Sequence, residues 1–167
     1  MGEWEALNTG RLYSERGNPS LYGACKVIDY SQGPFPDLST KVYRPFWEET
    51  KEGRLAFPRC ADCGKFHWYP MRLCPGCRSE RIEWAPVAGR GRIFTWTVVR
   101  YPFLQEFQSR LPYIVALVEF PDAPGVRLVT NIIEASPEET TIDALVEVVF
   151  HRVNDEIVLP LFRLVKE

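Results

Sequence analysis

Two closely spaced pairs of cysteines constrain this chain more than any other feature of its sequence. Cys60 and Cys63 form the first Cys-x-x-Cys pair, and Cys74 and Cys77 form the second. Each pair is typical of a tight turn that points two sulfurs to one place, and four thiolates satisfy tetrahedral Zn²⁺ at about 2.3 Å. The spacing therefore predicts a zinc ribbon with one ion. Because four thiolates leave no position for water or substrate, we expect this zinc to be structural.

Two other uses of the same cysteines stay open from the sequence alone. Iron in a rubredoxin-like site has the same ligands, and two redox disulfides are the other alternative. The fifth cysteine, Cys25, stands alone. A disulfide framework would leave this cysteine unpaired, so four cysteines that bind metal in a reducing cytoplasm explain the pattern better. His67 lies between the pairs, where we expect a surface or packing histidine.

Composition argues against several classes of function. The 167 residues are 46% hydrophobic and 13% aromatic, enough for one core and a small satellite module. A net charge of -2 and a pI near 5.8 give no general attraction for nucleic acid or anionic membranes. No apolar run approaches the roughly 20 residues of a membrane span, and the first ten residues are polar and acidic. We expect a soluble, cytoplasmic protein.

The sequence divides into four parts. Residues 1–40 contain many glycines and prolines without a helical or strand period, which predicts an extended arm that wraps a partner or folds back on its own domain. Residues 41–53 predict a short helix, with Pro45 near its start and a glycine at its end. Residues 54–82 form the cysteine module, and residues 83–167 are rich in β-branched and aromatic runs.

The last part predicts the fold class, which is mainly β. About five strand-like runs follow one another without helices between them, and several are apolar on both faces. A small closed barrel of the OB type fits this length and strand count, with an open sandwich as the alternative. The expected architecture is an arm and short helix, a rubredoxin-like zinc ribbon, and a C-terminal OB-fold barrel.

A search for catalytic groups finds few candidates. The sequence has no Gly-x-Ser-x-Gly, phosphate-loop or His-Glu-x-x-His motif, and its two histidines are His67 and His151. His151 falls on an expected strand, where a packed or solvated histidine is the simpler interpretation. Nothing near Cys25 favours a reactive thiolate. We therefore expect no catalytic residue, and the chain should not be an enzyme on its own.

Two sets of side chains are candidates for binding. The first combines cations suited to phosphates with flat rings suited to a base, although scattered solvated charges would give the same pattern. Its members are Arg59, Arg72, Arg90, Arg92, Phe94 and Trp96. The second set lies on the short helix and in an expected loop over residues 101–111, where aromatic side chains could bury in a partner or cover one end of the barrel. Its members are Phe46, Trp47, Tyr101, Phe103 and Phe107.

Several segments together resemble a known family. They are FWEETKEGRLAFPRC, CADCGKFHWYP, LCPGC, AGRGRIFTWTVV and LPLFRLV, in order over residues 42–167. In these motifs the chain resembles the DUF35 proteins, which join a rubredoxin-like zinc ribbon to an OB-fold and accompany thiolase-superfamily enzymes.

The resemblance implies an accessory subunit in a hetero-oligomer, with two copies of this chain and two of a thiolase-superfamily protein that supplies the catalytic residues. Coenzyme A or acyl-CoA is then the shared ligand, and the first set of side chains becomes a candidate CoA site. The implied reaction is thiolytic C–C cleavage of a 3-oxoacyl-CoA in aromatic or steroid degradation. A thiolase-like aldolase or an acyltransferase is the alternative partner. A nucleic-acid-binding module and an independent thioesterase or redox protein are the alternatives from other classes.

Overall fold

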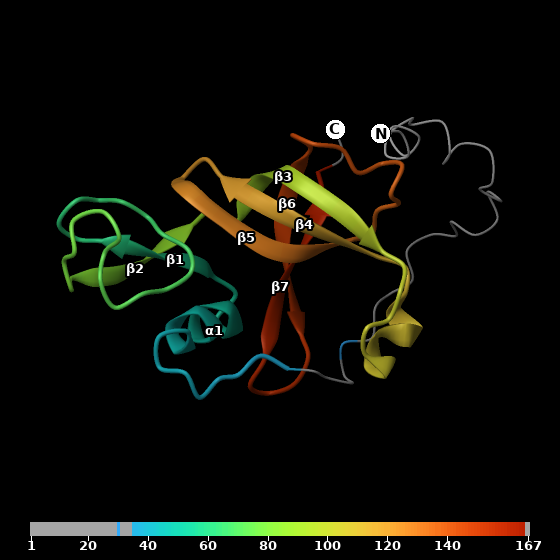
Figure 1. Ribbon diagram of the computed structural model, residues 1–167, viewed down its shortest axis with the longest axis horizontal. Helices are drawn as coiled ribbons and strands as arrows, with labels where there is room; N and C mark the ends of the chain where they lie inside the picture. Colours follow the sequence, from blue (N-terminus) through green and yellow to red (C-terminus); the bar gives the residue numbers. More distant parts are fainter. Residues whose placement is uncertain (1–29, 31–34, 166–167) are drawn as a thin grey trace, which may run out of the picture.

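The protein is described here from a computed structural model, which covers Tyr30 and residues 35–165. Two modules lie side by side along the longest axis: a small two-stranded ribbon and a closed β-barrel, with one helix against both (Figure 1). Most of the arm expected over residues 1–40, including Cys25, lies outside the described residues. Within the described part of the chain, no helix is long and apolar enough to cross a membrane.

Helix α1 spans Arg44–Lys51, which confirms the short helix. Pro45 stands in its first turn, where a missing N–H costs nothing, and Lys51 stands in its last turn, where a cation is favourable. Gly53 follows with φ +71°, a left-handed conformation that glycine adopts without strain. The buried residues of the helix are Phe46 and Thr50, so one face of α1 is fixed against the rest of the protein.

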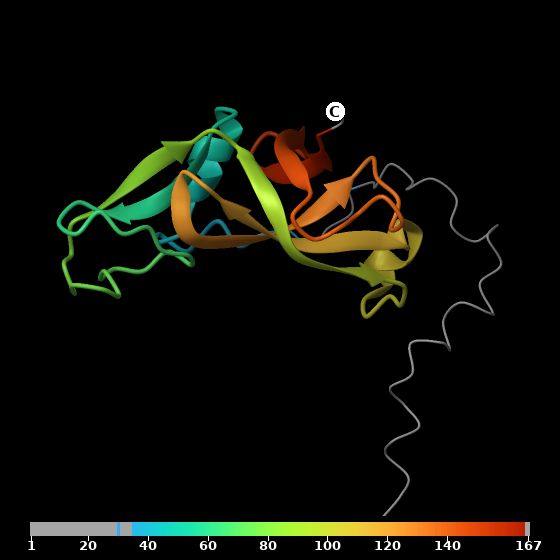
Figure 2. The same ribbon diagram turned by 90° about the horizontal axis from the view of Figure 1, so that it is seen from above.

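The ribbon consists of β1 (Leu55–Cys60) and β2 (Ile82–Val87), which pair in antiparallel register from Leu55 opposite Val87 to Cys60 opposite Ile82. The cysteine-bearing loops extend from the end of this hairpin that faces away from the barrel (Figure 2). All of β2 pairs with β1 in this two-stranded sheet.

The barrel contains five strands: β3 (Arg90–Val99), β4 (Tyr113–Phe120), β5 (Ala123–Ile133), β6 (Leu145–Arg152) and β7 (Val158–Leu164). They close in the order β3-β4-β5-β7-β6, with β5 and β7 parallel and the other neighbours antiparallel. This is the OB topology, so the predicted fold class is confirmed and the open sandwich is not formed. The segment expected to be a loop between β3 and β4 contains a 3₁₀-helix, η3 (Gln105–Arg110).

Two glycines explain how the chain passes from the ribbon into the barrel. Gly89 has φ +71°, and a Cβ there would lie 2.5 Å from Cγ1 of Val148. A Cβ on Gly91 would lie 2.6 Å from the carbonyl oxygen of Glu119. Both positions lack room for any side chain, because real Cβ atoms do not approach other atoms so closely. Glycine is thus required at positions 89 and 91, where the chain enters β3 against its neighbours.

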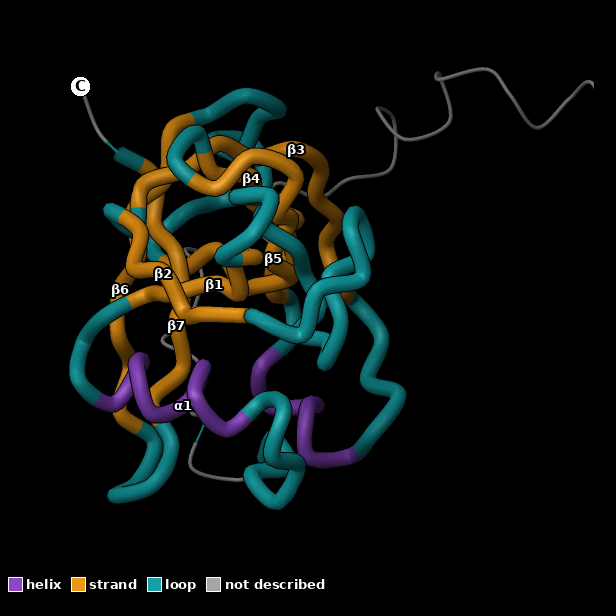
Figure 3. Tube along the Cα trace, turned by 90° about the vertical axis from the view of Figure 1, so that its left-hand side faces the viewer, coloured by secondary structure: helices purple, strands orange, loops and turns teal. Residues whose placement is uncertain are grey.

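Ribbon, helix and barrel share one hydrophobic core. Phe57 of β1 is fully buried, and its ring lies 5.0 Å from Phe120 of the barrel and 5.4 Å from Trp68 of the ribbon. Phe120 continues to Phe162 at 5.9 Å, and Phe46 brings α1 into the same cluster. Figure 3 shows α1 beside β7. The two modules are therefore not independent bodies.

Candidate metal centre and a neighbouring apolar pocket

The four cysteines of the two pairs converge on one point. Sγ of Cys60 lies 3.5 Å from Sγ of Cys77, and Sγ of Cys63 lies 3.6 Å from Sγ of Cys74. All four sulfurs lie within 4.8 Å of one another, and none forms a disulfide. Sulfurs placed tetrahedrally around zinc at roughly 2.3 Å would lie about 3.8 Å apart. The residues present therefore fit a four-sulfur metal site and not a pair of disulfides.

Backbone geometry holds each pair in this position. The N–H of Gly64 donates to the carbonyl oxygen of Cys60 at 2.9 Å, and the N–H of Arg78 donates to that of Cys74 at 2.9 Å. Gly76 donates its N–H to Sγ of Cys74 at 3.4 Å. The backbone N–H of Cys77 is the main cause that lowers the pKa of the Cys74 thiol to about 6. At Cys77 the backbone N–H of Ser79 is outweighed by the neighbouring thiols and burial together, which raise the pKa to about 12. The backbone donors therefore favour the thiolate, which is the form that binds metal, at Cys74 first.

His67 is a packing residue and not a surface residue. Its side chain is 5% exposed, and neither ring nitrogen has a hydrogen-bond partner among the described residues. Burial lowers the pKa of His67, because the charged imidazolium would lose its hydration. The prediction that it packs is thus correct, and the alternative of a surface position is wrong.

The arginines of the predicted CoA set lie on separate parts of the molecule. Arg59 donates to the carbonyl of Gly64 in the ribbon at 3.3 Å. In the barrel, Arg90 lies 3.9 Å from Glu147, and Arg92 donates to the carbonyl of Asp143 at 2.8 Å. Arg72 and Arg92 line two different cavities. Among the described residues, Arg72 and Arg92 thus lie on separate surfaces.

A β-bulge separates the two rings of the same set. The register of β3 against β4 shifts between Ile93 and Thr95. As a result Phe94 stays on the outer face, with the guanidinium of Arg127 3.5 Å above its ring, whereas Trp96 packs against the core. In a regular strand the two rings would share a face. The two rings of the candidate CoA set therefore lie on opposite faces of β3.

The predicted partner residues differ widely in exposure. Phe46 is 3% exposed and belongs to the core, so its assignment to a partner surface is wrong. Trp47 is half-buried against it, with the two rings 5.0 Å apart. In the loop before η3, Tyr101 and Phe103 are 71% and 88% exposed and touch edge to face at 5.8 Å. Phe107 is half-buried between Tyr113 and Arg110. Tyr101 and Phe103 remain available for a partner.

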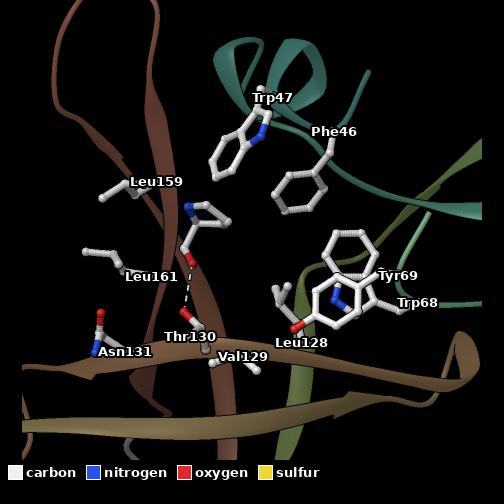
Figure 4. A pocket seen from close by; sticks show the side chains of 11 residues that line it. Phe46, Trp47, Trp68, Tyr69, Leu128, Val129, Thr130, Asn131, Leu159 and Leu161 are labelled. Atoms are coloured by element: carbon white, nitrogen blue, oxygen red, sulfur yellow. Dashed lines mark hydrogen bonds between the residues drawn. The ribbon is translucent and has the colours of Figure 1, made fainter. Parts of the chain in front are cut away.

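A pocket that sequence reasoning missed lies where the helix, the ribbon and the barrel meet (Figure 4). We call it the junction pocket. Its volume is about 260 Å³. Four rings form one wall, and side chains of β5 and β7 form the other. The lining residues are Phe46, Trp47, Trp68, Tyr69, Leu128, Val129, Thr130, Asn131, Leu159, Pro160 and Leu161. The sequence shows aromatic residues around Trp47 and around Trp68, but it does not show that the two groups meet in the folded protein.

The sequence matches two family models in succession. The model described as the rubredoxin-like zinc ribbon domain of ChsH2 matches residues 47–83, and that of the C-terminal OB-fold domain of ChsH2 matches residues 84–151. A solved structure described as "Ltp2-ChsH2(DUF35) aldolase" has a chain that is 30% identical, with a TM-score of 0.69. The match covers 77% of this chain and 98% of that one.

Curated relatives carry several names. A DUF35 domain-containing scaffold protein of Methanocaldococcus jannaschii is 30% identical over 71% of this chain and 84% of its own length. A probable enoyl-CoA hydratase alpha subunit of Thermomonospora curvata is 35% identical over 98% of this chain, which spans about half (54%) of that relative. The benzoylsuccinyl-CoA thiolase subunit BbsA of Geobacter metallireducens is 28% identical over 52% of this chain and 58% of its own length.

Proposed function

Because this chain belongs to the DUF35 family, we propose that it is a non-catalytic, zinc-binding subunit of a heteromeric thiolase-type enzyme that acts on acyl-CoA. The partner, a thiolase-superfamily protein, would supply the groups that react. This chain would assemble the complex and orient the bound thioester, and such positioning can supply much of a rate enhancement.

The closed four-sulfur centre is the observation that carries this proposal. Cys60, Cys63, Cys74 and Cys77 would hold Zn²⁺ with no ligand position left for a substrate or water. The ion would stabilise the fold of the ribbon and supply no chemistry. His151, the other histidine, packs its ring 5.3 Å from Tyr30, and no described residue pairs with it as a nucleophile would. Relatives named as scaffold proteins and as thiolase subunits support the same role.

Two surfaces are proposed for the partner and for CoA. Tyr101 and Phe103 are the described members of the partner set that are mostly exposed, so we place the docking contact there. Contacts to the phosphates of CoA would come from arginines of the first set, of which Arg72 and Arg92 line cavities.

Thiolysis of a 3-oxoacyl-CoA is the first candidate reaction of the complex, in line with the relatives named benzoylsuccinyl-CoA thiolase subunits. Aldol cleavage is the second candidate. It is favoured by a specific finding, because both family models are those of ChsH2 and the similar solved structure is described as an aldolase.

Co-purification tests the role and the reaction together. A tagged copy of this protein should recover an untagged thiolase-superfamily protein, and cleavage of acyl-CoA should require both chains. Thiolysis needs added CoA, whereas aldol cleavage of a β-hydroxyacyl-CoA does not, so the CoA requirement separates the two reactions. Turnover by this chain alone, or recovery of RNA instead of a protein, would contradict the proposal.

The docking contact has its own test. Replacing Tyr101 and Phe103 by serine should weaken the complex at least tenfold in a titration of partner against subunit. Ile142→Ser is the matched control, because Ile142 is 63% exposed and belongs to neither proposed set. Equal weakening by both variants would refute the assignment of the surface.

A further inference from the structure

We propose that the junction pocket binds the acyl part of an acyl thioester, as a neutral ring or a short aliphatic chain. This inference rests on the proposed function, since it assigns a place on this chain to one portion of the shared ligand. The far end of the acyl group would enter the pocket, and the carbons that react and the CoA portion would remain outside it, within reach of the partner.

The chemistry of the wall selects a neutral, apolar group. None of the residues that line the pocket is charged. Two of its polar side chains are engaged within the protein: Thr130 donates its hydroxyl to the carbonyl of Pro160 at 2.8 Å, and Asn131 donates its amide to the carbonyl of Ile114 at 3.0 Å. Tyr30 donates its hydroxyl to the amide oxygen of Asn131 at 3.4 Å. The indole N–H of Trp68 is buried and has no hydrogen-bond partner among the described residues, so it could donate to one neutral carbonyl oxygen. A phosphate or carboxylate placed here would lose its hydration and would meet no cation to replace it.

The volume limits the size of the ligand. A dry apolar cavity of about 150 Å³ is known to take up benzene, and sites for drug-sized ligands begin at about 300 Å³. The junction pocket, at about 260 Å³, lies between these two limits. It therefore suits a substituted ring or a chain of several carbons, and it is too small for an adenosine or a complete CoA.

The pocket is built before any ligand arrives. The ring of Phe46, 3% exposed, lies 5.0 Å from Trp47 and 5.0 Å from Trp68. These rings belong to the shared core, so little side-chain freedom remains to be lost on binding. On the open side, Tyr69 and Val129 are 54% and 51% exposed. A ligand can enter between them without any change in the core.

Blocking the opening provides the decisive variant. Val129→Trp fills space at an exposed rim position and leaves the core unchanged. Ile142→Trp makes the same replacement at a site 63% exposed that does not line the junction pocket. Val129→Ala widens the opening and should retain binding. The thermal midpoints of the three variants should lie within a few degrees of wild type, which shows that each one folds.

Calorimetric titration of the full chain, alone and with its partner, uses benzoyl-CoA, hexanoyl-CoA and CoA itself. We expect at least one acyl-CoA to bind ten times or more tightly than CoA, and Val129→Trp to remove this difference while Ile142→Trp preserves it. S-ethyl thiobenzoate, which lacks the CoA portion, should compete with benzoyl-CoA on the wild type. Equal affinity for CoA and both acyl-CoAs, unchanged binding by Val129→Trp, or no competition would each overturn the inference.

Measuring complex formation with the partner distinguishes failure of this inference from failure of the proposed function. If Val129→Trp still forms the complex but loses the acyl-dependent affinity, the pocket is a ligand site. If it fails to assemble while acyl binding is unchanged, the pocket receives a side chain of the partner, and the inference is wrong. If the wild type forms no complex at all, the proposed function fails, and the titrations of the single chain still decide the pocket.

Discussion

Replacing Phe57 by alanine should destabilise the ribbon and the barrel together. Phe57 is completely buried at the point where β1 meets the barrel, and its ring contacts Phe120 and Trp68. Truncation of a buried phenylalanine costs about 3–5 kcal/mol, including the cavity left behind. At roughly 2–4 °C per kcal/mol for a chain of this size, the thermal midpoint should fall by about 6–20 °C.

Unfolding of the two modules can be followed with two probes in one thermal scan. Far-ultraviolet circular dichroism follows the barrel strands, and a colorimetric zinc chelator follows release of metal from the ribbon. In the wild type both signals should change at one temperature, because one core connects the modules. In Phe57→Ala both should move down together. Phe103→Ala is the matched control, since a ring that is 88% exposed should contribute less than about 0.5 kcal/mol.

Two results would refute this reasoning. A loss below about 1 kcal/mol would mean that the ring is not tightly enclosed, because such truncations normally cost several times more. Zinc release that moves down while the barrel signal stays at the wild-type temperature would mean that the two modules unfold separately. The shared core would then have no energetic consequence.

Three further variants test other parts of the argument. Cys63→Ser should reduce bound zinc from one per chain to near zero by elemental analysis, since three thiolates no longer close the site; full retention of zinc would refute it. Burial lowers the pKa of His67 below its ordinary value of about 6.5, so the unfolded state binds more protons and stability falls as the pH drops below 6.5. In His67→Phe the loss of unfolding free energy between pH 7.5 and pH 5.5 should be smaller than in the wild type. Gly91→Ala places a Cβ 2.6 Å from the carbonyl of Glu119, which should cost about 1–3 kcal/mol in urea unfolding, and an unchanged midpoint would contradict the close approach.

The sequence predicts most of the fold because its signals are local. Cysteine spacing, the proline and glycine around α1, and five β-branched runs each report on a few neighbouring residues. They correctly predict the zinc ribbon, the short helix and the OB barrel. The family resemblance depends on the same segments, and the family models now confirm it.

The candidate surfaces were less predictable because they depend on orientation. Phe46 and Trp47 are adjacent, and nothing in the sequence indicates which one enters the core. The bulge between Ile93 and Thr95 reverses the face of every later residue in β3, and no glycine or proline marks it. The junction pocket combines α1 with β5 and β7, which lie far apart in the chain, so its existence depends on the packing of complete elements.

The barrel closes along seams of unequal length. β4 and β5 pair from Ile114 opposite Ile132 to Phe120 opposite Ala123, whereas β5 and β7 pair at Ile132 with Phe162 and at Ile133 with Arg163. The hydrogen bonds of backbone amides beside such a short parallel pairing need less free energy to break locally than those in a long antiparallel ladder. We therefore expect faster hydrogen–deuterium exchange along β7 where it faces β5 than within β4. The residues of β5 and β7 that line the junction pocket come just before this seam in both strands, so the barrel wall beside the pocket is joined by the fewest strand-to-strand pairs.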